Sequence, residues 1–213
     1  MKFLYEGGSA EIVEKKSRFI ATCRPVSSEE EALAFIAEMK KKYWNATHNC
    51  PAYVIGERSE LARCSDDGEP QGTAGRPMLS VLQQEDIHNC AVVVTRYFGG
   101  TLLGTGGLVR AYSRSVQEGL AASVIADRQD GYRLRIRTDY NGAGKIQYLL
   151  AQAGVPLLDT AYTDTVEMAA LVPAPRLHEL TEAITEKTAG RAQYLAQEPV
   201  RYAEVRGEYV FFE

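Results

Sequence analysis

Residues 90–116 read CAVVVTRYFGGTLLGTGGLVRAYSRSV, and this stretch decides the fold. Its first part, Cys90–Phe98, is almost wholly apolar and rich in β-branched residues, which predicts a central strand buried on both faces. The next nine residues, Gly99–Gly107, contain five glycines and predict a loop. From Leu108 to about Ser123 apolar residues recur at three- and four-residue spacing, which indicates an amphipathic helix. A buried strand, a glycine loop and a helix therefore follow one another.

The residues before this stretch predict further strands and helices. Residues 10–24 favour two strands joined by a charged turn at 14–17. Ser28 and Glu31 fit a capping box at the start of an amphipathic helix that runs to about Tyr43. The remaining expected elements are strands at Ala52–Ile55 and Leu61–Cys64 and a helix from Thr73 to about Gln84.

After the glycine stretch the pattern restarts, which predicts a second domain. The polar residues 127–131 mark the boundary, so we expect domains at 1–126 and 132–213. The second domain predicts the order βαββαβ, the ferredoxin-like arrangement. Its expected elements are strands at Tyr132–Thr138, Val155–Tyr162, Thr165–Val172 and Ala192–Ala196, the last extending to residues 200–205, and helices at Gly142–Ala153 and Pro175–Thr188.

Composition limits the possible functions. The 213 residues carry a formal net charge of −4, so RNA binding would need a local cationic patch. No apolar run is long enough to span a membrane, and the first residues resemble neither a signal nor a transit peptide. We therefore expect a cytoplasmic protein without membrane association. Its four cysteines, Cys23, Cys50, Cys64 and Cys90, are then expected to be reduced thiols.

The glycine loop and nearby arginines predict a site for phosphate or for a nucleic-acid backbone. Glycines let a backbone approach a ligand and turn N–H groups toward an anion, and guanidinium groups suit phosphate. Tyr97 could stack on a base, whereas we expect Phe98 to belong to the core. The predicted contact residues are Arg76, Arg96, Tyr97, Gly99, Gly100, Gly104, Gly106, Gly107, Arg110 and Arg114.

Two kinds of metal site and one catalytic class remain as alternatives. Asp66, Asp67 and Glu69 could hold Mg²⁺ in one loop, or the loop could be a simple turn. The tripeptide His-Asn-Cys occurs at 48–50 and 88–90 and could present zinc ligands, although zinc-finger spacing is absent. Covalent catalysis by a cysteine has no flanking signature.

Two blocks, DDGEPQGTAGRPML at 66–79 and VVVTRYFGGTLLGTGGLVRAYSRSV at 92–116, resemble the IMPACT/YigZ family. The resemblance extends over both halves and implies an α+β fold. The N-terminal domain would be a left-handed βαβ domain similar to domain IV of elongation factor G. The C-terminal domain would be ferredoxin-like. Eukaryotic members regulate translation through a kinase activator with an additional N-terminal domain, and we do not carry that partner over.

We therefore expect a translation-linked protein that binds RNA or the ribosome, with no cofactor and no established catalysis. The alternative is a Mg²⁺-dependent enzyme on a small phosphorylated substrate, which needs a deep pocket where the acidic and glycine loops converge. A third hypothesis is a module that binds a protein partner through the exposed face of the C-terminal sheet.

Overall fold

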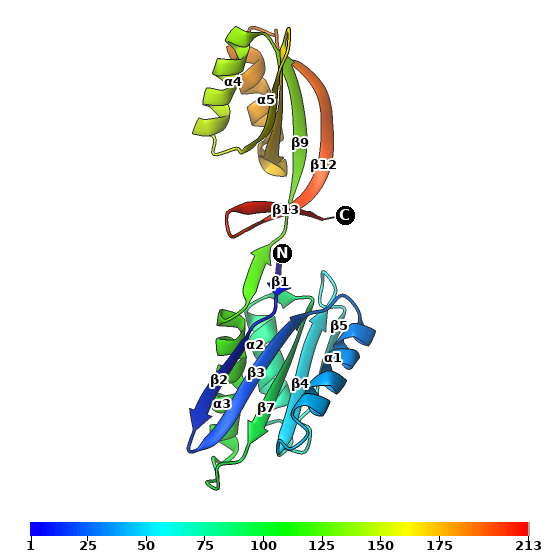
Figure 1. The fold of residues 1–213 in the computed structure, drawn as a ribbon, viewed down its shortest axis with the longest axis vertical. Helices are drawn as coiled ribbons and strands as arrows, with labels where there is room; N and C mark the ends of the chain where they lie inside the picture. The colour runs from blue at the N-terminus through cyan, green and yellow to red at the C-terminus, as the bar shows by residue number, and fades with distance from the viewer. Residues whose placement is uncertain (213) are drawn as a thin grey trace. The chain divides into compact units, whose positions relative to one another are not determined.

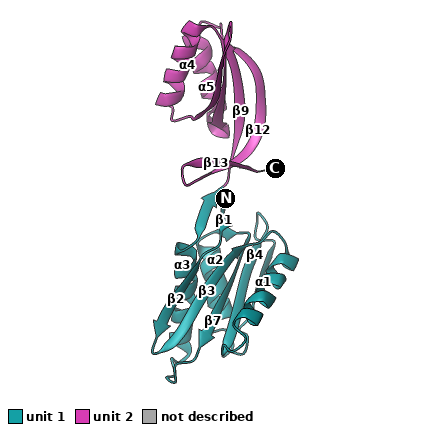
Figure 2. Cartoon of the chain, in the orientation of Figure 1, with its two compact units in different colours: residues 1–127 teal, residues 128–213 magenta. Residues whose placement is uncertain are grey.

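The computed structural model describes residues 1–212 and confirms an α+β protein. The chain forms two compact units, Met1–Asp127 and the residues from Arg128 onward (Figure 2). Within residues 1–212 no helix combines the length and the apolar character needed to cross a membrane.

A five-stranded antiparallel sheet forms the frame of the first unit, in the order β2-β3-β7-β4-β5 (Figure 1). The central strand, β7 (Cys90–Tyr97), is buried from Cys90 to Arg96, which confirms the prediction from its apolar sequence. The other strands are β2 (Ser9–Glu14), β3 (Ser17–Pro25), β4 (His48–Ile55) and β5 (Leu61–Cys64).

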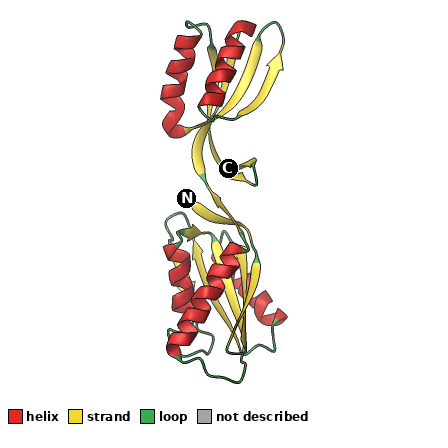
Figure 3. Ribbon diagram, turned by 90° about the vertical axis from the view of Figure 1, so that its left-hand side faces the viewer, coloured by secondary structure: helices red, strands yellow, loops and turns green. Residues whose placement is uncertain are grey.

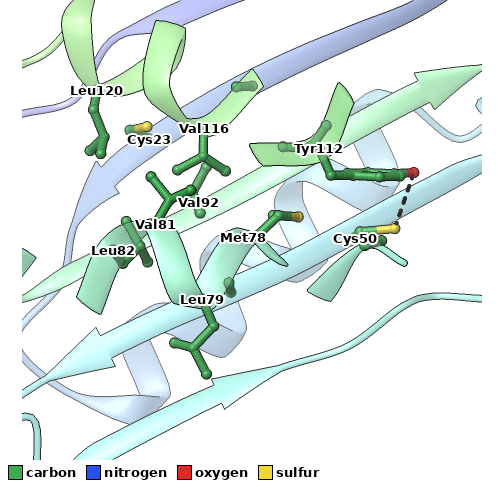
Figure 4. Close-up of a cluster of buried hydrophobic side chains, with 14 of the residues drawn as sticks. Cys23, Cys50, Met78, Leu79, Val81, Leu82, Val92, Tyr112, Val116 and Leu120 are labelled. Atoms are coloured by element: carbon green, nitrogen blue, oxygen red, sulfur yellow. Dashed lines mark hydrogen bonds between the residues drawn. The ribbon is translucent and has the colours of Figure 1, made fainter. Parts of the chain in front are cut away.

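Helices cover both faces of this sheet, which explains why β7 lacks an apolar–polar alternation. Val92 and Val94 pack in the core beneath α2 (Gly75–Gln84) and α3 (Thr105–Ala121), part of which is drawn in Figure 4. Ala91 and Val93 point to the opposite face, where they pack with α1 (Glu29–Lys42). Each fully buried valine contributes about 1.5–3 kcal/mol by leaving water.

The start of α1 differs in detail from the predicted capping box. The Ser28 hydroxyl accepts a hydrogen bond from the Glu31 N–H at 3.3 Å, as expected of an N-cap. The Glu31 carboxylate, however, accepts its main backbone hydrogen bond from the N–H of Ser27, at 2.6 Å. The reciprocal contact is therefore shifted one residue toward the N-terminus.

A small three-stranded sheet, in the order β6-β1-β8, was not predicted from the sequence. It joins β1 (Lys2–Glu6) to β6 (Ile87–His88) and β8 (Val124–Asp127). Leu4 of β1 is fully buried in the core beneath α2 and α3, so this sheet closes one end of the unit.

The second unit confirms the βαββαβ order and adds one strand. Its antiparallel sheet has the order β10-β11-β9-β12-β13, and the two helices lie on one face (Figure 3). A 3-10 turn at Ala174–Arg176 contains Pro175, so the last helix begins two residues later than predicted. The elements are β9 (Gln129–Thr138), α4 (Tyr140–Gln152), β10 (Leu157–Tyr162), β11 (Val166–Pro173), α5 (Leu177–Lys187), β12 (Gln193–Val205) and β13 (Glu208–Phe212).

Candidate functional site

Two carboxylates of the acidic loop organise the protein's own backbone. The Asp66 carboxylate accepts three hydrogen bonds, from the N–H groups of Gly72, Ala74 and Gly75 at 2.8, 3.1 and 2.8 Å, and so satisfies the start of α2. The Asp67 carboxylate accepts from the Asn49 N–H at 2.7 Å.

A change at Asp66 tests this structural role. Burial raises the pKa of Asp66, but the three backbone hydrogen bonds outweigh it and lower the pKa below its usual value. The stability that the charge contributes is therefore present above the unfolded pKa and lost as pH falls through the folded pKa. We expect Asp66→Asn to lower the free energy of unfolding by about 1–2 kcal/mol at neutral pH. Urea midpoints should converge with wild type in acid, and a pH-independent difference would contradict this role.

The third carboxylate, Glu69, lies in a buried polar network. Its Oε1 is 2.6 Å from Arg96 Nη1, and the two side chains are 2 % and 6 % exposed. The Tyr112 hydroxyl donates to the same oxygen at 2.7 Å. Arg96 Nη2 reaches the Ser17 hydroxyl at 3.4 Å. Arg96, predicted as a phosphate contact, is not available for one, because its guanidinium is buried and bound to Glu69.

The Mg²⁺ site of the alternative hypothesis is not assembled by these three carboxylates. Asp66 faces backbone N–H groups, Asp67 lies 2.6 Å from Lys40 Nζ, and Glu69 is paired with Arg96. Over residues 1–212 no cluster of three histidine, cysteine or acidic side chains is arranged to hold a metal ion. The acidic loop is a structural turn in this arrangement.

Residues of the first His-Asn-Cys tripeptide also contact other residues of the protein. Cys50 Sγ lies 3.0 Å from the Asp66 carbonyl oxygen and 3.4 Å from the Tyr112 hydroxyl (Figure 4). Burial raises the pKa of Cys50 to about 12, so the thiol stays protonated and is a poor nucleophile or metal ligand. His48 Nδ1 contacts the Asp67 carbonyl oxygen at 2.8 Å. All four cysteines are free thiols.

The glycine loop is shorter than predicted, because α3 begins at Thr105 and takes Gly106 and Gly107 into its first turn. Gly100 and Gly104 have φ angles of +80° and +72°, which favour glycine. Gly99 packs against the backbone of the β2–β3 turn and donates its N–H to the Ser17 hydroxyl at 3.1 Å.

The start of α3 concentrates positive charge. Its N-cap, Gly104, provides no side-chain hydrogen bond, and its first turn contains no acid. Arg110 Nη1 lies 3.6 Å from the position that a Cβ would take on Gly106, so the guanidinium lies beside the first turn. A cation at the positive end of a helix is unfavourable, and an anion there would be stabilised.

A cavity of about 230 Å³ adjoins this turn, between β2 and α3. We call it the basic cavity, because Arg110, Arg114 and Lys15 line it and Glu14 is its single acid. Arg114 lies 3.8 Å from Glu118, an exposed pair that contributes little. The other lining residues are Ile12, Leu103, Gly107 and Ala111. The exposed Arg76, on α2, is not among them.

The hairpin turn beside the cavity holds two lysines in a strained conformation. Glu14 pairs with Ser17, so Lys15 and Lys16 form a two-residue turn. Their φ angles are +45° and +67°, where Asn-Gly is the usual choice. This turn therefore keeps two cations at a cost in backbone energy.

Of the two aromatic residues at the end of β7, Tyr97 is half-buried and Phe98 is exposed. Tyr97 donates its hydroxyl to Asn45 at 3.0 Å, and Arg18 lies over its ring at 5.5 Å. Phe98, expected in the core, is 47 % exposed. Trp44, which was not predicted as a site residue, is 81 % exposed in the loop between α1 and β4.

Comparison with known proteins places both units in known families. Residues 15–120 match the Impact N-terminal domain, and residues 136–191 match a domain of unknown function, DUF1949. IMPACT family member YvyE of Bacillus subtilis is 45 % identical over 187 residues, which cover 88 % of this chain and 86 % of that protein. This chain belongs to the IMPACT family. YigZ of Escherichia coli, another member, is 34 % identical over 86 % of this chain and 91 % of its own length.

The match to a eukaryotic relative covers less of the chain. Protein IMPACT of Mus musculus is 37 % identical over 98 residues, which cover 44 % of this chain and 30 % of that protein.

The chain is also similar to a solved structure, which is described as a hypothetical protein. The TM-score is 0.58 at 32 % identity, and the match covers 92 % of this chain and 96 % of that chain.

Proposed function

We propose that this IMPACT family protein acts in the cytoplasm as a translation-linked factor that binds RNA or the RNA surface of the ribosome through its N-terminal domain, without catalysis. The observation that carries the proposal is the basic cavity at the uncapped start of α3. The link to translation is carried over from the family resemblance.

The cavity has the chemistry of a phosphate contact. Arg110, Lys15 and Lys16 have no carboxylate within ion-pair distance among residues 1–212. Cations without partners gain more from a phosphate than paired ones, because no existing ion pair must break. The N–H groups of the first turn of α3 add donors that only an external group or water can satisfy.

The competing hypothesis of a Mg²⁺-dependent enzyme receives less support. It needs the acidic and glycine loops to converge on one deep pocket, but Asp66, Asp67 and Glu69 have internal partners. None of the three lines the basic cavity. The acidic loop and the basic cavity therefore do not form one catalytic pocket, and this favours a binding role over an enzymatic one.

Charge removal at the cavity tests the proposal. We expect the double variant Arg110→Ala, Arg114→Ala to bind a labelled RNA about tenfold more weakly in fluorescence anisotropy. The slope of log affinity against log salt should fall by about 1–2, because each lost phosphate contact removes about one unit. Arg63→Ala is the matched control, since Arg63 is exposed on β5 at the opposite edge of the sheet. Absence of RNA binding at low salt, or a double variant equal to wild type, contradicts the proposal.

A second variant separates binding from folding. Lys15→Asn with Lys16→Gly introduces the preferred turn sequence, so it should stabilise the hairpin while it weakens RNA binding. Loss of affinity in a more stable protein cannot result from unfolding.

A further inference from the structure

The only tryptophan in the chain, Trp44, is exposed to solvent. Its side chain is 81 % exposed, although tryptophan is highly buried on average. Leu102 is 82 % exposed and Phe98 is 47 % exposed. Large apolar side chains that gather on a surface mark a binding site more often than a structural need.

The loops that carry these three residues lie at one end of the N-terminal sheet, which we call the loop end (Figure 1). The loop end consists of the turn at 15–16, the loop at 43–47 and the loop at 98–104. Its loops are tied to each other and to β7. The Thr47 N–H donates to the Arg96 carbonyl oxygen at 2.8 Å, and the Phe98 N–H donates to the Thr47 hydroxyl at 3.1 Å. Trp44 is therefore presented from an anchored loop.

Lysines precede Trp44 closely in the sequence. Trp44 follows Lys40, Lys41 and Lys42 at the end of α1. Lys40 pairs with Asp67 at 2.6 Å, and Lys42 lies over the Tyr43 ring at 5.1 Å. Lys41 has no ion-pair partner among residues 1–212. Lysine is depleted from the cores of protein–protein interfaces, whereas interleaved cations and aromatic rings are typical of single-strand binding surfaces.

We propose that Trp44 stacks on an unpaired base of single-stranded RNA, a role that rests on the proposed function and names its substrate class. The phosphates of that strand lie on Lys15, Lys16 and Lys41 and in the basic cavity. A duplex keeps its base faces stacked on each other, so it offers nothing for the indole to cover. An exposed aromatic ring gains a stacking partner only where bases are unpaired.

The test uses the full chain, a labelled oligouridylate and an RNA duplex of the same length. Because Trp44 is the sole tryptophan, its fluorescence reports this contact directly when tyrosine is not excited. We expect the single strand to quench Trp44 and to bind more tightly than the duplex. Trp44→Ala should weaken single-strand binding about tenfold, since one base–aromatic stack is lost. Its salt slope should stay at the wild-type value, and Trp44→Phe should keep most of the affinity.

The outcomes separate this inference from the proposed function. If Trp44→Ala binds as wild type and the fluorescence does not change, RNA binding stands and the stacking role falls. A duplex bound as tightly as the single strand also overturns the choice of substrate class. If neither RNA binds at low salt, the proposed function fails and the stacking role fails with it. Urea midpoints of both Trp44 variants should equal that of wild type, because the side chain is exposed.

Discussion

Replacing Arg96 with methionine should lower the free energy of unfolding by about 3–5 kcal/mol, because the Glu69 carboxylate would stay buried without its guanidinium partner. The two side chains are 6 % and 2 % exposed, so water cannot replace the lost partner. The Arg96 guanidinium lies over the Phe19 ring, 5.4 Å from its centroid, and a methionine thioether can pack on that ring in its place. Urea denaturation followed by circular dichroism measures the change.

A second substitution, at Glu69, tests whether the broken ion pair causes the loss of stability. Adding Glu69→Gln removes the buried charge and leaves a carbonyl oxygen that can accept from the Tyr112 hydroxyl. The double variant should therefore be more stable than Arg96→Met alone. If Arg96→Met lost less than about 1 kcal/mol, the pair would behave as an exposed one and its structural role would be refuted.

The burial of Arg96 shows what strand patterns cannot reveal. The apolar sequence of β7 predicts a central strand, and this is confirmed. A strand buried on both faces has no alternation, so a lone arginine on it cannot be assigned to solvent, ligand or core. Its partner, Glu69, is 27 residues away on a loop that reads as an ordinary acidic turn. Only the packing of that loop over β7 decides between a ligand contact and an internal ion pair.

Elements that depend on neighbouring residues in the sequence were predicted, whereas elements that depend on long-range pairing were not. The βαββαβ order of the second unit follows from periodicity and turn residues within short windows. The small sheet was missed because β1 pairs with β8, more than 100 residues away, and β6 has only two residues. Trp44 was missed because a lysine run at a helix end also fits a solvated terminus. Its signal was an indole placed two residues after that run.

The loop end depends on one close backbone approach, at Gly99. A Cβ on this residue would lie 2.1 Å from the Lys16 carbonyl carbon and 2.4 Å from the Ser17 nitrogen. Both are backbone atoms of the hairpin turn, so no side-chain rotation relieves the overlap. We expect Gly99→Ala to lower the free energy of unfolding by about 3 kcal/mol, the upper end for overpacking. Urea denaturation measures this loss.

Gly106→Ala is the matched control. Gly106 is exposed in the first turn of α3, and its added Cβ would meet only Arg110 Nη1, at an ordinary 3.6 Å. Alanine there should leave stability unchanged or raise it by up to about 1 kcal/mol. Gly99→Ala should also weaken RNA binding, because it separates the lysine turn from the glycine loop and splits the cations that the basic cavity brings together. Equal stability of the two variants would show that the hairpin turn moves freely, and the preorganised loop end would then have to be abandoned.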